Sequence, residues 1–305
     1  MGHHHHDHGH DHHHHHDHSR AFGIGIALNL AFVFAEAFWG LASHSLALLA
    51  DAGHNFGDVL ALLLAWGAAI LSKRIPSARY TYGFRSSSIL AGLFNAILLL
   101  VVTGGIMVEA ASRIGHPEPV NGSVVAWVAL FGFLVNVSTA LLLRHGSHDL
   151  NIRAAFLHMA ADAAVSLGVA CSGVLVVFTG AGWIDPAVSL VVSVVVIYGT
   201  WDLLKDSIGL ALDAVPEDID PAAVRKYLSA LPGVSEVHDL HIWGMSTTER
   251  ALTAHLVMPQ GHPGDAFLSG ICGYLHEAFH IGHATLQVEM GDPAHPCQLA
   301  PDHLV

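Results

Sequence analysis

The chain alternates long apolar stretches with short polar links from residue 21 to residue 205. The apolar stretches lie at 21–42, 46–71, 86–112, 122–143, 154–178 and 184–205. A helix needs about 20 apolar residues to cross a hydrocarbon core of ~30 Å, and within lipid only a helix or a closed barrel satisfies its own backbone. The pattern therefore predicts an all-α bundle of six transmembrane helices over residues 19–212.

A different pattern begins near residue 213. Residues 234–245, 249–259 and 284–292 alternate apolar and polar positions, as half-buried strands do. Helical segments precede the first strand and separate the second from the third. The resulting order αββαβ predicts a small ferredoxin-like α+β domain over residues 213–292, with residues 293–305 as a loose C-terminal tail.

Basic residues predict the orientation. The link between the second and third stretches carries Lys73, Arg74, Arg79 and Arg85, and the fourth-to-fifth link carries Arg144 and Arg153. The third-to-fourth link has only Arg113 at its edge. Because basic loops remain on the cytoplasmic side, we expect both termini in the cytoplasm. We also expect the first stretch to be retained as a span, since no basic segment of a signal peptide precedes it.

Composition supports a membrane protein and excludes some other classes. Apolar residues make up 52% of the chain and charged residues 12%, where about a quarter is usual. The net charge of −13 argues against a nucleic-acid partner. Three widely spaced cysteines, Cys171, Cys272 and Cys297, predict neither a disulfide framework nor a thiolate zinc finger.

Histidine is strongly enriched, with 27 in the chain, and nearly half of them lie in residues 1–18. This run of histidines cannot form a core, so we predict a disordered tail whose imidazoles and carboxylates bind transition metals. An expression tag is the alternative interpretation. Tags are usually uninterrupted, whereas this run contains Asp7, Gly9, Asp11 and Asp17.

Two membrane stretches each contain a His-x-x-x-Asp pair. His54 and Asp58 lie in the second stretch, and His158 and Asp162 lie in the fifth. The i, i+4 spacing puts each pair on one helical face, and ionisable groups inside a bilayer require a partner, a cavity or an ion. One pair alone could brace two helices. Two opposed pairs supply the four N and O ligands of tetrahedral Zn²⁺, whereas calcium and magnesium prefer more oxygen.

Other polar residues in the stretches leave their roles open. Asp51 precedes His54 by three positions, which is consistent either with a role around the metal site or with helix packing. Ser166 lies beside Asp162 and has the same two interpretations. Asp185 precedes Pro186 at the start of the sixth stretch, where we predict a helix cap.

Three segments carry a family resemblance: HSLALLADAGHNFGD, YGFRSSSILAGLFNA and GVSEVHDLHIWGMSTTERALTAHLVMP. The chain resembles the cation diffusion facilitator family, in its bacterial zinc-exporter branch. The resemblance implies a homodimer with six spans per protomer, a cytoplasmic ferredoxin-like domain and metal–proton antiport. It also implies that the two His-x-x-x-Asp pairs form the transport site, and histidine in both first positions resembles the zinc-selective members.

The resemblance further implies regulatory metal ligands at His238, His255 and Glu289, with His283 as a weaker candidate. Two departures stand out. Residues 73–84 contain no histidine or acid, so we predict no metal site in that link. Ser86 stands where relatives carry a second basic residue, which predicts a weaker charge interlock between protomers.

These observations predict a secondary active transporter that exports a divalent transition metal, most readily zinc, from the cytoplasm in exchange for protons. Its partners are the metal ion, protons, the bilayer and a second copy of the chain. An intramembrane metalloprotease would need HExxH, but Asn55 follows His54 and Met159 follows His158, so no enzyme is expected. The alternative is a membrane-bound metal sensor or metal-storage protein with a structural intramembrane site.

Overall fold

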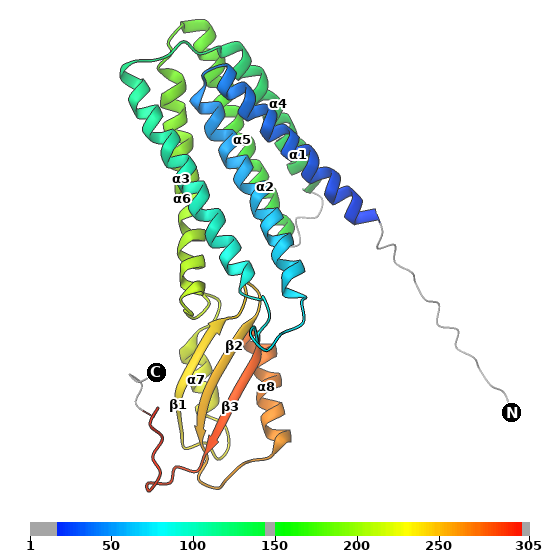
Figure 1. Cartoon of the computed structure of the whole chain (residues 1–305), viewed down its shortest axis with the longest axis vertical. Coiled ribbons are helices and arrows are strands. Elements are labelled where there is room, and N and C mark those ends of the chain that lie inside the picture. The colour runs from blue at the N-terminus through cyan, green and yellow to red at the C-terminus, as the bar shows by residue number, and fades with distance from the viewer. Residues whose placement is uncertain (1–16, 144–149, 301–305) are drawn as a thin grey trace, which may run out of the picture. The chain divides into compact units, whose positions relative to one another are not determined.

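The computed structural model of the chain describes residues 17–143 and 150–300. Each predicted apolar stretch forms one helix (Figure 1): α1 (Asp17–Ala42), α2 (Leu46–Ser72), α3 (Ser87–Gly115), α4 (Gly122–Leu143), α5 (Leu150–Thr179) and α6 (Ile184–Ala211). Among the described residues, five helices, α2 to α6, are long and apolar enough to cross a membrane. The apolar part of α1, Asn29–Ala42, is shorter. A helical membrane region is therefore established, and the sixth span remains a prediction.

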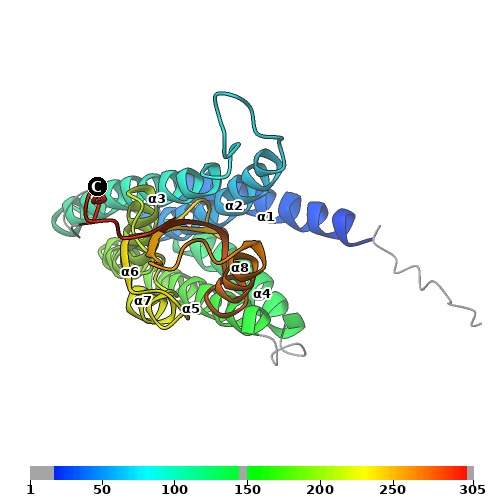
Figure 2. The same cartoon turned by 90° about the horizontal axis from the view of Figure 1, so that it is seen from below.

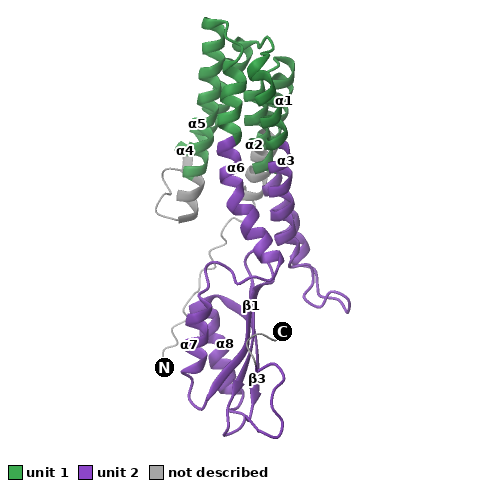
Figure 3. Cartoon of the chain, turned by 90° about the vertical axis from the view of Figure 1, so that its left-hand side faces the viewer, with its two compact units in different colours: residues 1–59, 103–193 green, residues 60–102, 194–305 purple. Residues whose placement is uncertain are grey.

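The predicted His-rich tail and the fourth-to-fifth link fall mainly on residues 1–16 and 144–149, outside the described residues. The chain divides into two compact units (Figure 3), which are residues 1–59 with 103–193 and residues 60–102 with 194–305. The boundaries pass through α2, α3 and α6. Both His-x-x-x-Asp pairs belong to the first unit, and the C-terminal domain belongs to the second.

Glycines bring α4 and α5 into close contact in the first unit. A Cβ atom on Gly173 of α5 would lie 2.6 Å from the backbone nitrogen of Ala126, and one on Gly122 of α4 would lie 2.5 Å from the carbonyl oxygen of Gly173. Neither position has room for a side chain. Small residues at such crossings let membrane helices approach until their backbones touch.

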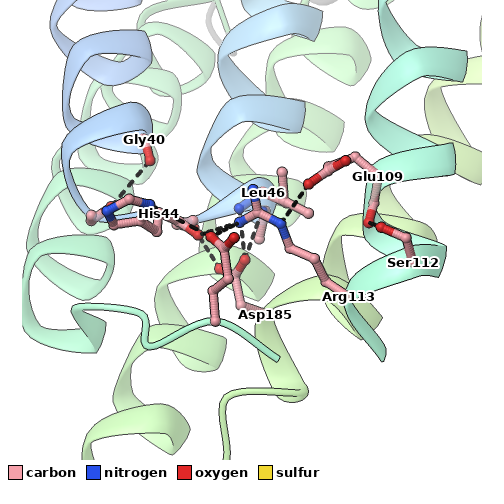
Figure 4. Close-up of polar contacts among 11 residues, drawn as sticks. Gly40, His44, Leu46, Glu109, Ser112, Arg113 and Asp185 are labelled. Carbon is pink, nitrogen blue, oxygen red and sulfur yellow. Dashed lines mark hydrogen bonds and ion pairs between the residues drawn. The ribbon is translucent and has the colours of Figure 1, made fainter. Parts of the chain in front are cut away.

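Asp185, in the first turn of α6, caps the neighbouring helix α2. Its Oδ2 atom accepts hydrogen bonds from the backbone N–H groups of Leu46 (2.7 Å) and Ala47 (3.3 Å), and the hydroxyl of Ser45 donates to Oδ1. Figure 4 shows Asp185 and Leu46 facing each other. The sequence predicted a cap at Asp185, and the structure assigns the capped N-terminus to α2 rather than to α6.

An arginine joins three segments at this end of the first unit (Figure 4). Nε of Arg113, in the last turn of α3, lies 2.8 Å from Oε1 of Glu109. Its Nη1 lies 3.0 Å from Oε2 of Glu118 and 3.2 Å from the carbonyl oxygen of His44. The side chain therefore connects α3 to the α3–α4 link and to the α1–α2 link.

The C-terminal domain contains α7 (Pro221–Ser229), β1 (Glu236–Gly244), β2 (Arg250–Val257), α8 (Asp265–Phe279) and β3 (Ile281–Glu289). The sheet order is β1-β2-β3, with β1 antiparallel and β3 parallel to the central strand β2. Both helices lie on one face of the sheet (Figures 1 and 2). The predicted order αββαβ is confirmed. A complete ferredoxin-like fold has one further strand before the first helix, so that assignment remains a prediction.

Strand β3 begins at Ile281, three residues before the predicted start. His280 adopts a left-handed conformation (φ 57°) that ends α8 and turns the chain directly into the strand. Residues Pro221 and Asp220 define the start of α7 in the expected way, because the Asp220 side chain accepts a hydrogen bond from the Ala222 N–H at 2.9 Å.

Alternation along the strands separates an apolar face from a polar one. Val237 and Leu256 pack with α7 and α8 in the domain core. The next pair along the ladder, His238 and His255, belongs to the opposite face. A β-bulge between His238 and His241 interrupts this alternation, and Asp239 there has φ 49°. Aspartate tolerates this left-handed geometry better than most residues.

Within the second unit, the segment before α3 contacts the β1–β2 turn. Arg85 Nη1 lies 2.8 Å from Glu249 Oε1, and the Ser86 hydroxyl donates to the Met245 carbonyl at 3.3 Å. Ser86 thus has a partner inside its own chain, while the predicted weakening of an interlock between protomers remains a prediction.

Candidate metal centres

The two His-x-x-x-Asp pairs of α2 and α5 face each other. Oδ2 of Asp58 lies 3.9 Å from Nε2 of His54 and 3.4 Å from Nε2 of His158. Asp162 places Oδ1 3.1 Å from Nε2 of His54 and Oδ2 3.6 Å from Nε2 of His158. Each carboxylate therefore approaches both imidazoles, and the two imidazole rings are 6.2 Å apart.

Burial is graded across these four side chains. Asp162 is 3% exposed and His54 18%, whereas Asp58 is 28% and His158 48% exposed. Ligand atoms of His54, Asp58 and Asp162 all lie within 4.8 Å of one another. This compact trio and the more open His158 form a cluster that can be approached from the His158 side.

Buried polar residues next to the cluster link the helices that carry it by hydrogen bonds. Asp51 is fully buried, and its Oδ2 accepts a hydrogen bond from the Ser166 hydroxyl at 2.9 Å, which joins α2 to α5. Asn55 donates to Oε2 of the fully buried Glu36 at 3.0 Å, which joins α2 to α1. Asp51 and Ser166, whose roles the sequence left open, thus brace the two helices that carry the pairs.

A second cluster lies on the polar face of the sheet. Glu289 Oε1 lies 2.8 Å from His255 Nδ1, and Glu289 Oε2 lies 3.4 Å from His238 Nε2. The two imidazole rings are 5.2 Å apart, because His238 and His255 are direct partners in the β1–β2 ladder. The structure thus brings together the three residues that the resemblance had singled out.

His283 does not join this cluster. It lies near the beginning of β3, opposite Ala251, whereas Glu289 ends the same strand. Its ring contacts the Tyr82 ring edge-on at 5.6 Å. Five residues of β3 separate His283 from Glu289, so the structure does not bring His283 together with this cluster.

The environment of Glu289 favours its charged form. Burial raises the pKa of its carboxyl group, but hydrogen bonds with Cys297 and Gln287 and the charges of His238 and His255 outweigh burial and lower the pKa below its usual range. The carboxylate is therefore available as an anionic ligand at neutral pH.

Two residues near this cluster escaped the sequence analysis. Cys297 Sγ lies 3.5 Å from His255 Nδ1, and Asp239 Oδ2 lies 3.3 Å from His255 Nε2. Asp239 reaches His255 through the bulge, which periodicity does not reveal. Cys297 lies in a segment that was predicted to be a loose tail. The only hint of a metal ligand there is that a histidine, His295, lies two positions before the cysteine.

Comparisons with known proteins match both the helical region and the C-terminal domain. Residues 23–210 match the family model of the cation efflux transmembrane domain, and residues 216–291 match that of the cation efflux protein cytoplasmic domain. The chain is 39% identical to the zinc transporter ZitB of Escherichia coli, over 87% of this chain and 85% of that protein. It is 35% identical to the metal cation efflux system protein CzcD of Cupriavidus metallidurans, over 88% of this chain and 84% of that protein.

A third relative, the cadmium, cobalt and zinc/H(+)-K(+) antiporter of Bacillus subtilis, is 31% identical over 85% of each chain. The fold and the clustered imidazoles and carboxylates define an integral membrane protein with a C-terminal α/β domain and candidate metal sites. The chain belongs to the cation efflux family, as the resemblance had implied.

Proposed function

We propose that this protein is a secondary active transporter that exports a divalent transition metal, zinc foremost, from the cytoplasm in exchange for protons. The observation that carries the proposal is the pair of facing His-x-x-x-Asp motifs on α2 and α5. The names of the relatives support it, since they are a zinc transporter, a metal cation efflux protein and an antiporter for cadmium, cobalt and zinc.

The proposed transport site consists of His54, Asp58, His158 and Asp162. Its two carboxylates offset the charge of a divalent ion, which is costly to leave uncompensated in a low-dielectric interior. Two imidazole nitrogens and two carboxylate oxygens are ligand types that tetrahedral zinc accepts. The ion is the substrate here, so the graded burial, with His158 most exposed, supports a site that both binds and releases it.

Protons act by competing for the same ligands. Imidazoles and carboxylates bind metal only when deprotonated, so protons arriving from the far side displace the ion. Histidine is suited to this exchange near neutral pH. We infer alternating access, in which rearrangement of the helices exposes the site first to the cytoplasm and then to the opposite side.

Each part of the chain has its own role in the proposed transporter. Residues 1–18 form the His-rich metal-binding tail, residues 19–212 the six-span transmembrane domain, residues 213–292 a cytoplasmic ferredoxin-like domain and residues 293–305 the C-terminal tail. Both termini lie in the cytoplasm, and the chain acts as a homodimer. In the cytoplasmic domain, His238, His255 and Glu289 bind a regulatory metal, which the close approach of their ligand atoms supports.

Zinc flux into proteoliposomes with an imposed pH gradient tests the transport site. Asp162→Asn keeps the shape of a buried ligand and removes its charge, so we expect flux to fall to the level of empty liposomes. Asp202→Asn is the matched control, because it neutralises an exposed carboxylate of α6 that pairs with Lys205. Wild-type flux in Asp162→Asn would disprove the assignment.

The same assay separates the proposal from the alternative of a metal sensor or storage protein. Such a protein would bind zinc in proportion to its amount but accumulate none inside the liposomes. Flux that continues for many ions per protomer, and that stops when the pH gradient is collapsed, identifies the antiporter.

A further inference from the structure

The cluster on the sheet contains a fourth group with a ligand atom. Cys297 Sγ lies with the ligand atoms of His238, His255 and Glu289 within 4.8 Å of one another. The four come from four separate segments, namely β1, β2, the end of β3 and the segment that follows β3. They are therefore a product of the tertiary fold and not of local spacing.

His238 is buried in this cluster with both ring nitrogens unsatisfied among the described residues. Its side chain is only 4% exposed, yet neither ring nitrogen has a hydrogen-bond partner in the described part of the chain. Its nearest carboxylate oxygens, from Glu236 and Glu289, lie 3.5 and 3.4 Å away. Burying an unsatisfied polar group is unfavourable, and a metal ion bound to the ring would remove that cost.

His255 is already oriented as a ligand. Asp239 Oδ2 lies 3.3 Å from His255 Nε2, while Glu289 and Cys297 both approach Nδ1. A carboxylate beside the far nitrogen of an imidazole fixes the tautomer and raises the basicity of the other nitrogen, as behind many metal-bound histidines. The bulge at Asp239 supplies this carboxylate.

The chain returns to the cluster after β3 through a defined turn. Asp292 accepts a hydrogen bond from the Ala294 N–H at 2.8 Å, and its carbonyl accepts one from the His295 N–H at 3.0 Å. Pro293 and Pro296 restrict the backbone between these contacts. The turn delivers the Cys297 thiol to His255.

We propose that Cys297 is the fourth ligand of a thiolate-containing metal site with His238, His255 and Glu289, and that metal binding pins residues 290–297 to the sheet. This deepens the proposed regulatory site in the cytoplasmic domain. The ligand set of one sulfur, two nitrogens and one oxygen fits tetrahedral zinc or cadmium and disfavours magnesium and calcium. On binding, the thiol releases its proton to solvent and becomes the thiolate ligand.

Cadmium provides a direct probe, because a cadmium–thiolate bond absorbs in the ultraviolet and the four proposed transport ligands include no sulfur. The full-length protein in detergent, carrying Asp162→Asn to weaken the transport site, is titrated with cadmium. We expect an absorption band whose intensity corresponds to one cadmium–thiolate bond per protomer. Cys297→Ser should abolish this band, and Cys272→Ser should retain it. Cys272 in α8 is the matched control, since it also lies outside the membrane helices and is partly buried.

Alkylation followed by mass spectrometry gives an independent measurement. We expect zinc to slow alkylation of Cys297 at least tenfold, to leave Cys272 unchanged, and to lose its effect on Cys297 in His238→Asn. Size-exclusion chromatography verifies that the variants remain folded. A band that persists in Cys297→Ser, or equal alkylation of Cys297 with and without zinc, overturns the proposal.

The outcome is separable from that of the transport proposal. Protection of Cys297 in a protein that carries no zinc flux would leave this site standing and remove the transporter. Normal flux in wild-type proteoliposomes together with an unprotected Cys297 would leave the transporter standing and remove this thiolate site.

Discussion

His54 and His158 occupy the first position of each pair, and this choice of imidazole has a consequence for selectivity. Cadmium is larger than zinc and tolerates more oxygen ligands, whereas zinc favours a compact tetrahedral set of nitrogen and oxygen. In the structure, the His54 ring lies between Asp58 and Asp162, so its replacement changes the centre of the cluster.

We expect His54→Asp to lower the ratio of zinc flux to cadmium flux by about tenfold, a difference of about 1.4 kcal/mol. The added carboxylate makes the site more anionic and lets it expand its coordination by bidentate binding. Parallel zinc and cadmium uptake in proteoliposomes measures the ratio. The control is His44→Asp, which changes an exposed histidine in the α1–α2 link. An active mutant with an unchanged ratio would show that selectivity is determined elsewhere.

At the level of single residues, the clustering of the two His-x-x-x-Asp pairs was predictable because regular helices make spacing equivalent to position. An i, i+4 pair must share a face, and a charged residue in lipid must point inward. The same reasoning could not find Asp239, because a bulge breaks the two-residue period of β1. It could not find Cys297 either, because only the tertiary fold returns the segment after β3 to the sheet.

Among the elements, the contact of α4 with α5 depends on two glycines. A methyl group at Gly173 would overlap the backbone of Ala126, so Gly173→Ala must push the two helices apart. Overpacking of this kind typically costs about 1–3 kcal/mol. We expect a lower thermal midpoint in detergent and reduced zinc flux, because α5 also carries His158 and Asp162.

Gly168→Ala is the control for this prediction. It lies on the same helix, and among the described residues a Cβ atom there meets no atom within 4 Å. We expect its midpoint to equal or exceed that of the wild type, since alanine favours a helix over glycine. Equal destabilisation by both substitutions would show that the close approach of α4 and α5 at Gly173 is not the cause.

The helices whose length is determined by the thickness of the bilayer were predicted well. The bilayer dictates about 20 apolar residues, and the helix boundaries of α2, α3 and α4 lie within three residues of the predicted stretches. The start of β3 was missed because it depends on the left-handed residue His280, and histidine carries no strong signal for that geometry. The capping of α2 by Asp185 is likewise a tertiary contact that local sequence does not encode.

For the molecule as a whole, the His-rich run is separate in sequence from every ligand of the proposed transport site. We expect deletion of residues 3–18 to leave the maximal zinc flux within about twofold of wild type, because no transport ligand is removed. The zinc concentration for half-maximal flux should rise, since a local store of imidazoles is lost. Flux measured over a zinc series gives both quantities.

A chain in which the histidines of residues 3–18 are replaced by serine controls for length. It should behave like the deletion. Complete loss of flux in a deletion variant that still inserts and remains folded would contradict this view of the tail and assign it a step in transport itself.

The cap that α6 supplies to α2 also orders events in time. Leu46 and Asp185 lie 139 positions apart, so the ribosome makes the first turn of α2 on the order of ten seconds before it makes the capping carboxylate. During that interval the first N–H groups of α2 lack this partner, and the growing chain is exposed to membrane proteases. We expect Asp185→Ala to be synthesised at the normal rate but degraded faster in pulse-chase experiments than Asp202→Asn. The cap of α2 is therefore complete only once α6 has been made, and this order of synthesis is what the pulse-chase comparison tests.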